Sequence, residues 1–349
     1  MKRYSVILAA GKGTRMKSRD VNRSKVSFPI LGKALVNYVL DVCEQLDTKE
    51  NVVVVGFGGE VTKSLVEDRA TVVWQHQTLG TGHALMQAAP ILEGKKGHTI
   101  VLCGDTPLLT EKTLNNLFKK HEKSEADLTV LTAVIENPKG YGRIIRNDKT
   151  RQVLAIREDK DCSSDEFEVC EINSGVYVFN NEKLFKYLKL IKNNNSQHEY
   201  YLTDLVALFV RDDLKVEAYI AEDAQEIFGI NDRTQLAYAA KVIKKRINKE
   251  HMKNGVSIED PNTTYISPDV TIGKDTVIMP NTIILGNCEI GEANFIGPNT
   301  FITNSNIGDD NKISCSKITN CKIGNNTEIG SFVEISDITV SDGEKVKRQ

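Results

Sequence analysis

Residues 266–302 read ISPDVTIGKDTVIMPNTIILGNCEIGEANFIGPNTFI, and an isoleucine stands at every sixth position. The series resumes after a slip at Ile307 and reaches its last isoleucine at Ile335, and glycine follows several of these positions. A period of six predicts a β-helix in which each isoleucine faces inward and each glycine permits a corner. We therefore expect a short hexapeptide-repeat left-handed parallel β-helix over residues 256–340, with a polar, frayed tail over residues 341–349.

The chain before the repeats has a different pattern, in which short runs rich in β-branched residues alternate with amphipathic segments. The expected strands are residues 4–10, 52–56, 71–74, 99–103, 128–135 and 173–179. The expected helices are residues 34–46 and 111–121, one that Thr203 caps, and residues 233–253, which stop before Gly255. This alternation predicts an α/β domain over residues 1–230, Rossmann-like and with a mixed, mostly parallel sheet. A connecting helix over residues 231–255 would lead to the β-helix.

The composition excludes several classes of protein. The 349 residues leave room for two domains, and the net charge of -2 favours neither nucleic acid nor a membrane surface as a partner. No apolar run approaches the roughly 20 residues of a membrane helix, and the first residues do not form a signal peptide. The seven cysteines are scattered and form no CxxC pair, so a zinc site or a disulfide framework is not expected. These features are typical of a reduced, cytoplasmic protein.

The first expected strand leads into a basic segment, AAGKGTRMKSRDVNRSK at residues 9–25. Its Gly11 and Gly13 form a GxG pair, but Met16 replaces the third glycine of a dinucleotide-binding fingerprint, and the spacing also departs from a P-loop. A glycine turn with solvated charges is the simplest alternative. However, loops at the carboxyl ends of parallel strands are where α/β sheets bind ligands, and Arg15 adds a fork suited to phosphate. We therefore favour a nucleoside triphosphate as the ligand.

Further short motifs follow in order. They are Gln75, Leu79-Gly80-Thr81-Gly82-His83-Ala84, Cys103-Gly104-Asp105-Thr106-Pro107-Leu108, Gly140-Tyr141-Gly142-Arg143-Ile144, Glu158, Glu171-Ile172-Asn173-Ser174-Gly175, Glu199-Tyr200-Tyr201-Leu202-Thr203-Asp204 and Gly229-Ile230-Asn231. With the opening loop they resemble sugar-1-phosphate nucleotidyltransferases. With the hexapeptide region added, nearly the whole chain is similar to the bacterial bifunctional N-acetylglucosamine-1-phosphate uridyltransferase/glucosamine-1-phosphate acetyltransferase family.

The resemblance implies an activity and a set of site residues. UTP and N-acetylglucosamine 1-phosphate would give UDP-N-acetylglucosamine and pyrophosphate with Mg²⁺, in a homotrimer assembled through the β-helix. Arg15 and Lys25 would be catalytic and grip the triphosphate, and Asp105 and Asn231 would hold Mg²⁺. The nucleotide would lie on Leu8, Ala9, Ala10, Gly11, Gln75, Gly80 and Thr81. The sugar phosphate would lie on Gly104, Gly142, Glu158 and Asn173.

The chemistry accounts for some of these residue types without the family. Asp105 follows an expected strand at the same sheet edge as Gly11, and carboxylate oxygens suit Mg²⁺. An attacking phosphate oxygen is already ionised and needs no base, so we interpret His83 as structural. Two alternatives stay open: a related nucleotidyltransferase with another sugar or nucleotide, and a non-catalytic sugar-nucleotide-binding protein. A pyrophosphate-release assay separates an enzyme from a sensor.

The second reaction of the bifunctional family is not expected of this chain. Acetyl transfer from acetyl coenzyme A to an amine needs a base, and histidine is the side chain best tuned to neutral pH. None of the six histidines lies beyond residue 251, so the hexapeptide region has none. The last predicted repeat, at Ile335, also precedes the long helix and tail of the two-reaction enzymes.

Overall fold

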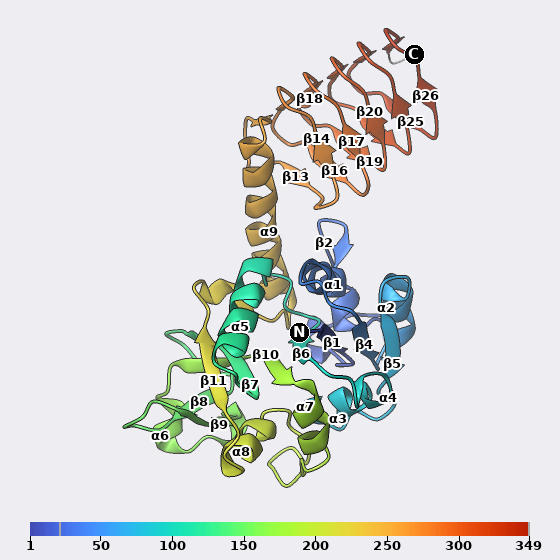
Figure 1. Ribbon diagram of the computed structural model, residues 1–349. Coiled ribbons are helices and arrows are strands. Elements are labelled where there is room, and N and C mark those ends of the chain that lie inside the picture. The colour runs from blue at the N-terminus through green and yellow to red at the C-terminus, as the bar shows by residue number, and fades with distance from the viewer. Residues whose placement is uncertain (21, 348–349) are drawn as a thin grey trace. The chain divides into compact units, whose positions relative to one another are not determined.

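The computed structural model describes residues 1–20 and 22–347, which form two compact units (Figure 1). Among these residues, the first unit comprises 1–20, 22–28 and 34–235, and the second comprises 29–33 and 236–347. The first unit contains two hydrophobic clusters and the second contains one. Each unit therefore has its own core.

A nine-stranded sheet forms the centre of the first unit. Its main path runs in the order β11-β7-β10-β6-β1-β4-β5. These strands are β1 (Arg3–Ala9), β4 (Asn51–Val55), β5 (Thr71–Trp74), β6 (His98–Cys103), β7 (Leu128–Val134), β10 (Glu171–Asn180) and β11 (Val216–Ile220). Neighbours on this path pair in parallel, except that β10 runs antiparallel to β6 and β7. The predicted mixed, mostly parallel sheet is confirmed.

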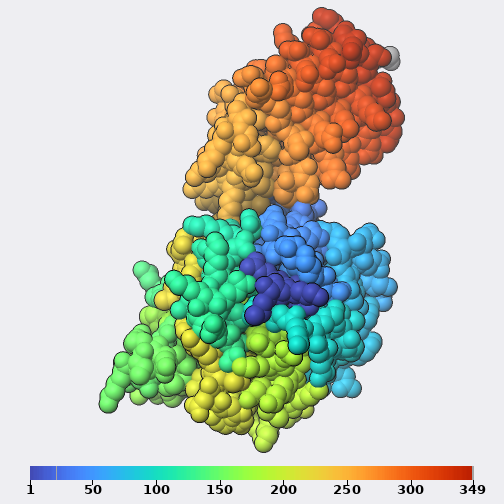
Figure 2. All heavy atoms as spheres, viewed as in Figure 1, coloured from blue at the N-terminus to red at the C-terminus, as the bar shows by residue number. Residues whose placement is uncertain are grey.

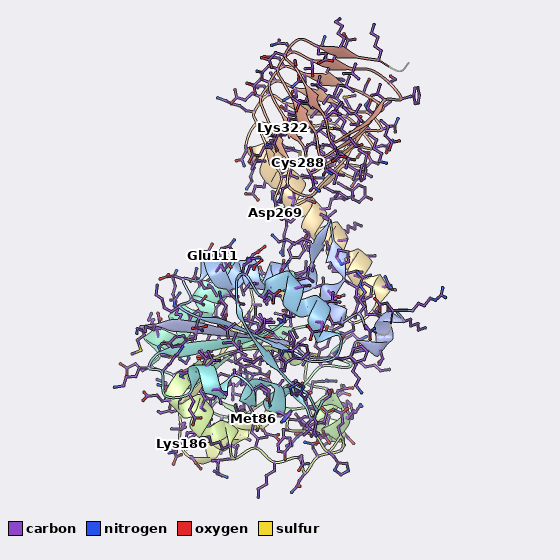
Figure 3. The ribbon with its side chains drawn as sticks, turned by 90° about the vertical axis from the view of Figure 1, so that its right-hand side faces the viewer. Met86, Glu111, Lys186, Asp269, Cys288 and Lys322 are labelled. Atoms are coloured by element: carbon purple, nitrogen blue, oxygen red, sulfur yellow. The ribbon has the colours of Figure 1, made fainter. Side chains whose placement is uncertain are left out.

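Helices cover both faces of this sheet. One face is covered by α1 (Leu35–Gln45), α2 (Gly59–Val66) and α5 (Glu111–Lys123), and the other by α3 (Thr81–Met86), α4 (Ala89–Leu92), α7 (Asn181–Leu188) and α8 (Asp204–Arg211). In Figure 3, Glu111 of α5 and Met86 of α3 lie on opposite sides of the sheet. Successive strand residues alternate between the two clusters, as Val6 and Ile7 do, because side chains alternate along a strand.

Smaller elements complete the first unit. They are η1 (Thr14–Met16), η2 (Lys25–Ser27), β8 (Arg143–Arg146), β9 (Val153–Arg157), η3 (Asp159–Asp161), α6 (Ser164–Phe167) and η4 (Ala224–Ile227). The short strands β2 (Pro29–Ile30) and β3 (Lys33–Ala34) pair with each other. Strands β8, β9 and β11 were not among the predicted strands. β8 pairs antiparallel with β9 and joins β10 through Arg143 and Ile172, which attaches this hairpin to the sheet.

The predicted cap of α8 is wrong in its side-chain contact. Thr203 does precede the helix, but its hydroxyl makes no capping bond. It donates instead to the Oε1 atom of Glu158, at 2.9 Å. Further along the chain, α9 (Arg233–Lys253) has the bounds of the predicted helix, and Gly255 follows it with a φ of 95°. That left-handed conformation favours glycine just past a helix end.

The second unit contains a parallel β-helix with three sheet faces. Figure 1 draws its strands, and Figure 2 shows the outer surface of the same residues as spheres. The first face consists of β12 (Ser257–Ile258), β15 (Val277–Ile278), β18 (Phe295–Ile296), β21 (Lys312–Ile313), β24 (Glu328–Ile329) and β27 (Lys345–Val346). The second consists of β13 (Tyr265–Ile266), β16 (Ile283–Leu285), β19 (Phe301–Thr303), β22 (Lys317–Thr319) and β25 (Glu334–Ser336). The third consists of β14 (Thr271–Ile272), β17 (Glu289–Ile290), β20 (Asn306–Ile307), β23 (Lys322–Ile323) and β26 (Thr339–Val340). The strand pairing is consistent with the predicted left-handed hexapeptide form.

The isoleucines of the repeat form the core of this β-helix, as predicted. Ile278, Ile284, Ile296 and Ile302 are fully buried. The slip in the period reflects shorter coils, because Ile278 pairs with Ile296 whereas Ile296 pairs with Ile313 one residue closer in sequence. A corner residue is lost there without any change in strand pairing.

The glycines of the corners are explained by close contact between coils. A Cβ atom on Gly273 would lie 2.6 Å from the carbonyl carbon of Gly291, and one on Gly291 would lie 2.8 Å from that of Gly308. Real Cβ atoms do not approach other atoms so closely. Glycine at equivalent corners therefore lets successive coils stack backbone on backbone.

The prediction of a frayed tail after residue 340 is wrong for part of that segment. Lys345–Val346 forms β27 and pairs with β24, and Thr339–Val340 pairs with β23. The inward positions after Ile335 are taken by Val340 and Val346, so the repeat continues with valine in place of isoleucine. Residues 348 and 349 lie outside the described residues.

Candidate functional site

Most of the predicted site residues come together where several parallel strands end. Gly11 follows β1, Gln75 follows β5 and Asp105 follows β6. Because these strands are parallel, their carboxyl ends share one edge of the sheet. Asn173 reaches the same edge from β10, whose first residues lie there because β10 runs in the opposite direction. The sheet topology thus gathers groups that lie far apart in sequence.

Four charged or polar side chains meet at this edge. The Nζ atom of Lys25 donates to Asp105 Oδ2 and lies 3.0 Å from Asn231 Oδ1. The Nη2 atom of Arg15 also donates to Asn231 Oδ1, at 2.8 Å. The residues predicted to be catalytic and those predicted to hold metal therefore form one contiguous cluster. Its two cations and one carboxylate leave it with a net positive charge, which suits a polyanionic ligand.

Local backbone features place this cluster. Gly13 has a φ of 60°, and a Cβ atom there would lie 2.5 Å from the Cβ atom of Lys25, so glycine lets the loop lie against this lysine. Met16, only 1% exposed, anchors the short helix η1. The backbone amide of Asn231 donates to Gln235 Oε1 at 2.7 Å, which fixes the start of its segment.

The chain from Gly229 to Asn231 packs directly against Asp105. The amide of Ile230 donates to the carbonyl oxygen of Asp105 at 2.8 Å. A Cβ atom on Gly229 would lie 3.6 Å from Asp105 Oδ1, within ordinary contact. This backbone contact holds the amide of Asn231 beside the carboxylate of Asp105, although the two residues lie on distant parts of the chain.

The donor set at this point fits a hard divalent cation. One carboxylate oxygen and one amide oxygen lie within reach of the same ammonium group, that of Lys25. Oxygen ligands of this kind suit Mg²⁺, which usually keeps waters and substrate phosphates as its other ligands. Within residues 1–20 and 22–347, no group of three or more His, Cys, Asp or Glu side chains is arranged to hold a metal ion. A cation here would therefore take most of its ligands from solvent or substrate.

The predicted nucleotide residues form a second group. The Nε2 atom of Gln75 lies 3.0 Å from the carbonyl oxygen of Gly80 and 3.0 Å from Nδ1 of His83. Thr81 accepts a bond from the amide of Leu202, at 3.1 Å. Gly80 has a φ of 105°, and a Cβ atom there would lie 2.7 Å from the carbonyl oxygen of Tyr200. These contacts fix the turn before α3, and His83 supports Gln75.

The rest of the nucleotide group is backbone at the end of β1. Leu8 and Ala9 are the last residues of the strand, and Ala10 and Gly11 follow it. Ala9 and Ala10 are buried, whereas Gly11 is exposed and a Cβ atom there would have no neighbour within 4 Å. Gly104 lies next to this strand, and its amide donates to the carbonyl of Leu8 at 2.9 Å.

The predicted sugar residues lie around β10 and the β8–β9 hairpin. The amide of Asn173 donates to the carbonyl oxygen of Gly142 at 2.8 Å, and the side chain of Asn173 donates to the hydroxyl of Tyr177 at 2.7 Å. Glu158 follows β9, and burial raises the pKa of its carboxyl above the ordinary value, while the hydroxyl of Thr203 opposes that rise. The carboxyl of Glu158 thus has a defined orientation and is poorly hydrated.

Several residues that support the site were not predicted to belong to it. Thr203 and Tyr177 orient Glu158 and Asn173, and Gln235 fixes the backbone of Asn231. Arg143 was part of a quoted motif without a role, yet it is 2% exposed and contacts Asp159 beside Glu158. Its place in the same motif as Gly142 was the available sequence signal, whereas its burial was not.

Not all the basic residues of the opening loop join the cluster. The guanidinium of Arg23 stacks on the ring of Phe28, with 4.1 Å between Cζ and the ring centroid. Arg19 and Lys17 are exposed. Only Arg15 and Lys25 of the six contact Asp105 or Asn231 through the side-chain bonds described above.

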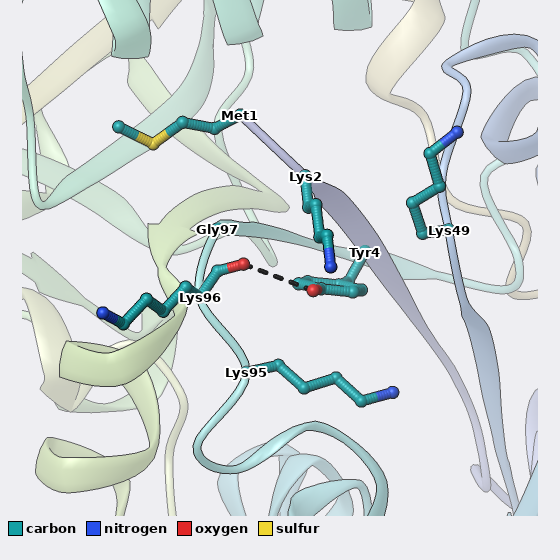
Figure 4. Close-up of a pocket in the computed structure, with 7 residues that line it drawn as sticks. All are labelled: Met1, Lys2, Tyr4, Lys49, Lys95, Lys96 and Gly97. Carbon is teal, nitrogen blue, oxygen red and sulfur yellow. Dashed lines mark hydrogen bonds between the residues drawn. The ribbon is translucent and has the colours of Figure 1, made fainter.

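A separate hollow of about 870 Å³ lies at the opposite ends of β1 and β6 (Figure 4). It is lined by Met1, Lys2, Tyr4, Lys49, Lys95, Lys96 and Gly97. Two of its lysines already face acids, since Lys49 lies 2.9 Å from Asp47 and Lys95 lies 3.4 Å from Glu50. This hollow lies at the other end of the strands from the cluster of Arg15, Lys25, Asp105 and Asn231, so it is a poor candidate for a phosphate or metal site shared with that cluster.

Comparison with known proteins matches both units. Residues 4–232 match the family model described as nucleotidyl transferase, and residues 269–304 match that of the bacterial transferase hexapeptide (six repeats). The bifunctional protein GlmU of Halalkalibacterium halodurans is 46% identical over 316 residues, covering 90% of this chain and 69% of the relative. The bifunctional protein GlmU of Geobacillus sp. is 48% identical over 313 residues, covering 90% of this chain and 67% of the relative. The bifunctional protein GlmU of Enterococcus faecalis is 48% identical over 307 residues, covering 88% of this chain and 66% of the relative. The matches thus span about two thirds of these relatives.

Across the described residues, no helix is long and apolar enough to cross a membrane.

Proposed function

The chain belongs to the nucleotidyl transferase family that includes the bifunctional GlmU proteins, and from this membership we propose that it is a UDP-N-acetylglucosamine diphosphorylase. It would transfer the uridylyl group of UTP to N-acetylglucosamine 1-phosphate and release pyrophosphate. The observation that carries the proposal is the cluster of Arg15, Lys25, Asp105 and Asn231 at the carboxyl edge of the sheet. We assign this activity to residues 1–230, with residues 231–255 as a connecting helix and residues 256–340 as the β-helix domain.

The reaction is an in-line displacement at the α-phosphorus of UTP. A phosphate oxygen of the sugar phosphate forms the new bond, and the bond to the leaving pyrophosphate breaks. The attacking oxygen is already ionised, so the site needs orientation and positive charge rather than a base. Arg15 and Lys25 supply that charge from a loop held by Gly13 and Met16. Both side chains contact Asn231 and would turn to phosphate oxygens when UTP binds.

We propose that Asp105 and Asn231 hold a divalent cation, Mg²⁺, together with substrate phosphates. Such an ion neutralises charge that develops on the phosphate oxygens during transfer. In this arrangement Lys25 and the cation use the same protein oxygens, because Lys25 contacts both residues. With a cation held by Asp105 and Asn231, Lys25 would give up its contact with Asp105, and its ammonium would be free to reach a phosphate oxygen.

We propose that the uracil and ribose lie near Gln75, Gly80 and Thr81 and along the backbone from Leu8 to Gly11. The sugar phosphate would lie near Gly104, Gly142, Glu158 and Asn173. The two regions flank the charged cluster, because Gly11 and Asp105 follow the neighbouring strands β1 and β6 while Asn173 lies on β10 beyond them. A triphosphate and a sugar phosphate could thus approach the cluster from opposite sides.

A substrate panel tests this proposal. We expect turnover with UTP and N-acetylglucosamine 1-phosphate in the presence of Mg²⁺, and little with ATP, dTTP or glucose 1-phosphate. A clear preference for one of the latter would favour a related sugar-1-phosphate nucleotidyltransferase. Tight binding of the sugar nucleotide without pyrophosphate release would favour a non-catalytic sensor.

We propose that the β-helix assembles as a homotrimer. Its first coils carry apolar side chains that point outward. On the second face, paired positions of successive coils hold Tyr265, Ile283 and Phe301. On the first face, paired positions hold Val277 and Phe295. Tyr265 is 40% exposed and Phe295 is 42% exposed. The later coils carry lysine or glutamate at the same register. Contact with further copies would remove the exposed apolar residues from water.

We propose that this chain does not transfer acetyl groups to glucosamine 1-phosphate. The hexapeptide region has no histidine to take a proton from the ammonium group, which must lose it before the amine can attack. Release of free coenzyme A from acetyl coenzyme A, dependent on glucosamine 1-phosphate, would contradict this proposal.

A further inference from the structure

A buried arginine lies behind the sugar side of the candidate site. Arg143 begins β8, and its side chain is 2% exposed. Its Nη1 atom donates to the carbonyl oxygen of Tyr141 and lies 3.0 Å from Oδ1 of Asp159. Its Cζ atom lies 5.8 Å from the centroid of the Phe167 ring. The side chain is therefore enclosed between the loop before β8 and the segment after β9.

This arginine joins two segments that carry proposed sugar contacts. Tyr141 precedes Gly142 in the loop before β8, and Asp159 follows Glu158 in the segment after β9. Arg143 is also the residue of β8 that pairs with Ile172 of β10, directly before Asn173. Three of the four proposed sugar-phosphate residues are thus immediate chain neighbours of groups that Arg143 contacts or pairs with.

A buried guanidinium is an unusual choice for packing alone. Arginine stays charged at all ordinary pH values, and removal of its charge from water is unfavourable unless partners replace the water. An apolar side chain of similar volume often stabilises such a position equally well or better. A charge kept here is better explained by what it connects, because the Nη1 atom lies within reach of both the carbonyl oxygen of Tyr141 and Oδ1 of Asp159.

Asp159, the acidic partner of Arg143, lies directly after the proposed sugar-phosphate residue Glu158. Asp159 opens the 3-10 helix η3, and its side chain is 28% exposed. Its contact with Arg143 is an ion pair and not a well-directed hydrogen bond. Loss of either partner would release η3 from the loop before β8. On its other side, Glu158 would still be held by Thr203, which is 2.9 Å away.

We propose that Arg143 is a positioning residue for the sugar-phosphate half of the site: it sets the separation of Gly142 and Glu158 by holding Tyr141 and Asp159 together. This inference rests on the proposed function. None of the hydrogen bonds or ion pairs described here joins Arg143 to Arg15, Lys25, Asp105, Asn231 or Gln75. Its effect should therefore fall on the sugar phosphate and spare UTP.

Steady-state kinetics of four variants test this inference. Arg143→Met removes the charge, Asp159→Asn removes its ionic partner, and Arg143→Lys keeps a charge without the fork. The matched control is Arg146→Met on the same strand, which breaks the paired contacts of Arg146 with Glu171, both at 2.6 Å. KM for the sugar phosphate and KM for UTP are measured separately, with thermal melting of each variant.

We expect Arg143→Met to raise KM for N-acetylglucosamine 1-phosphate by about tenfold to a hundredfold, as for misplaced binding groups in general. KM for UTP should stay within about twofold, because none of the contacts of Arg143 described above reaches a proposed nucleotide residue. Asp159→Asn should shift the same constant in the same direction, and Arg143→Lys should fall between the parent and Arg143→Met. Arg146→Met should lower thermal stability without this selective change.

Each outcome has a distinct meaning. If the parent protein neither binds the sugar phosphate in a calorimeter nor turns it over, the proposed function fails and this inference fails with it. If the parent is active but Arg143→Met and Arg146→Met give the same KM for sugar phosphate, the inference alone is wrong. If Arg143→Met does not fold, Asp159→Asn carries the test, and an unchanged sugar-phosphate KM in that variant overturns the inference.

Discussion

Replacement of Lys25 by methionine should slow catalysis and at the same time tighten the binding of a divalent cation. The ammonium of Lys25 contacts Asp105 and Asn231, the two proposed metal ligands. A cation must displace it before it reaches their oxygens. Methionine keeps a side chain of similar length without the charge, so it removes the competitor. The same change removes a positive charge that the transferring phosphate needs.

The burial of the Lys25–Asp105 contact, together with general magnitudes for charged groups, gives the expected change in cation affinity and in kcat. The side chains of Lys25 and Asp105 are 15% and 16% exposed, so solvent screens their contact only in part. A hydrogen bond to a charged group contributes about 1.5–3 kcal/mol. The lower end of that range corresponds to roughly tenfold tighter cation binding in Lys25→Met. Loss of one preorganised charge at the reacting phosphate should lower kcat by about 10²–10³-fold.

Mn²⁺ is a suitable probe, because its binding can be followed by paramagnetic resonance without turnover. The parent, Lys25→Met and Lys12→Met are titrated, with Lys12 as an exposed lysine of the same loop. We expect tighter Mn²⁺ binding in Lys25→Met alone. Mn²⁺ binding that is unchanged or weaker in Lys25→Met would refute either the metal role of Asp105 or the competition with Lys25.

Three further predictions concern stability and assembly. Ile302→Ala should destabilise the β-helix by about 2–5 kcal/mol in denaturant unfolding, because this side chain is fully buried, whereas the 71% exposed Phe332 should tolerate alanine within about 0.5 kcal/mol. Burial and His98 lower the pKa of His121 from 6.5 to about 3, so the unfolded chain takes up a proton at a higher pH than the folded protein does. The contribution of His121 to the free energy of unfolding should therefore be complete above pH 6.5 and be lost as the pH falls toward 3. The variant His121→Gln should show a weaker dependence of unfolding free energy on pH in this range. Phe295→Glu should lower the mass seen by light scattering from that of a trimer, and a parent that is strictly monomeric would contradict the proposed assembly.

The repeat was readable from the sequence because one residue type marks each buried position. Ile278, Ile296 and Ile313 stack directly on one another along one face. The same rule failed at the end of the repeat, where valine takes the inward position at Val340 and Val346. Both residues face the interior, but a pattern defined by isoleucine does not include them.

The strands of the α/β unit were predicted where burial on both faces gives continuous apolar runs, as in Val52–Val55. The β8–β9 hairpin was missed because its strands are short and carry arginine at Arg143, Arg146 and Arg157. Strand β11 was missed for a related reason, since its residues are only partly buried at the edge of the sheet. Burial on a single face, or at an edge, leaves a weaker pattern in sequence.

The charged cluster shows what sequence alone could supply and what it could not. The position of Asp105 after a buried strand predicted its place at the sheet edge. No local pattern placed Asn231 there, because its contacts with Arg15 and Lys25 join residues more than 200 positions apart. The ion pair of Arg143 with Asp159 was equally invisible, since nothing in the sequence marks that arginine as buried.

The central claim is that this chain forms UDP-N-acetylglucosamine at the cluster around Asp105. The most direct test is to incubate the purified chain with UTP, N-acetylglucosamine 1-phosphate and Mg²⁺ and to follow all phosphorus species by nuclear magnetic resonance. We predict equal amounts of pyrophosphate and UDP-N-acetylglucosamine from the parent, and neither from Asp105→Asn at the same protein concentration. No pyrophosphate from a folded parent, or equal rates in Asp105→Asn, would contradict the claim.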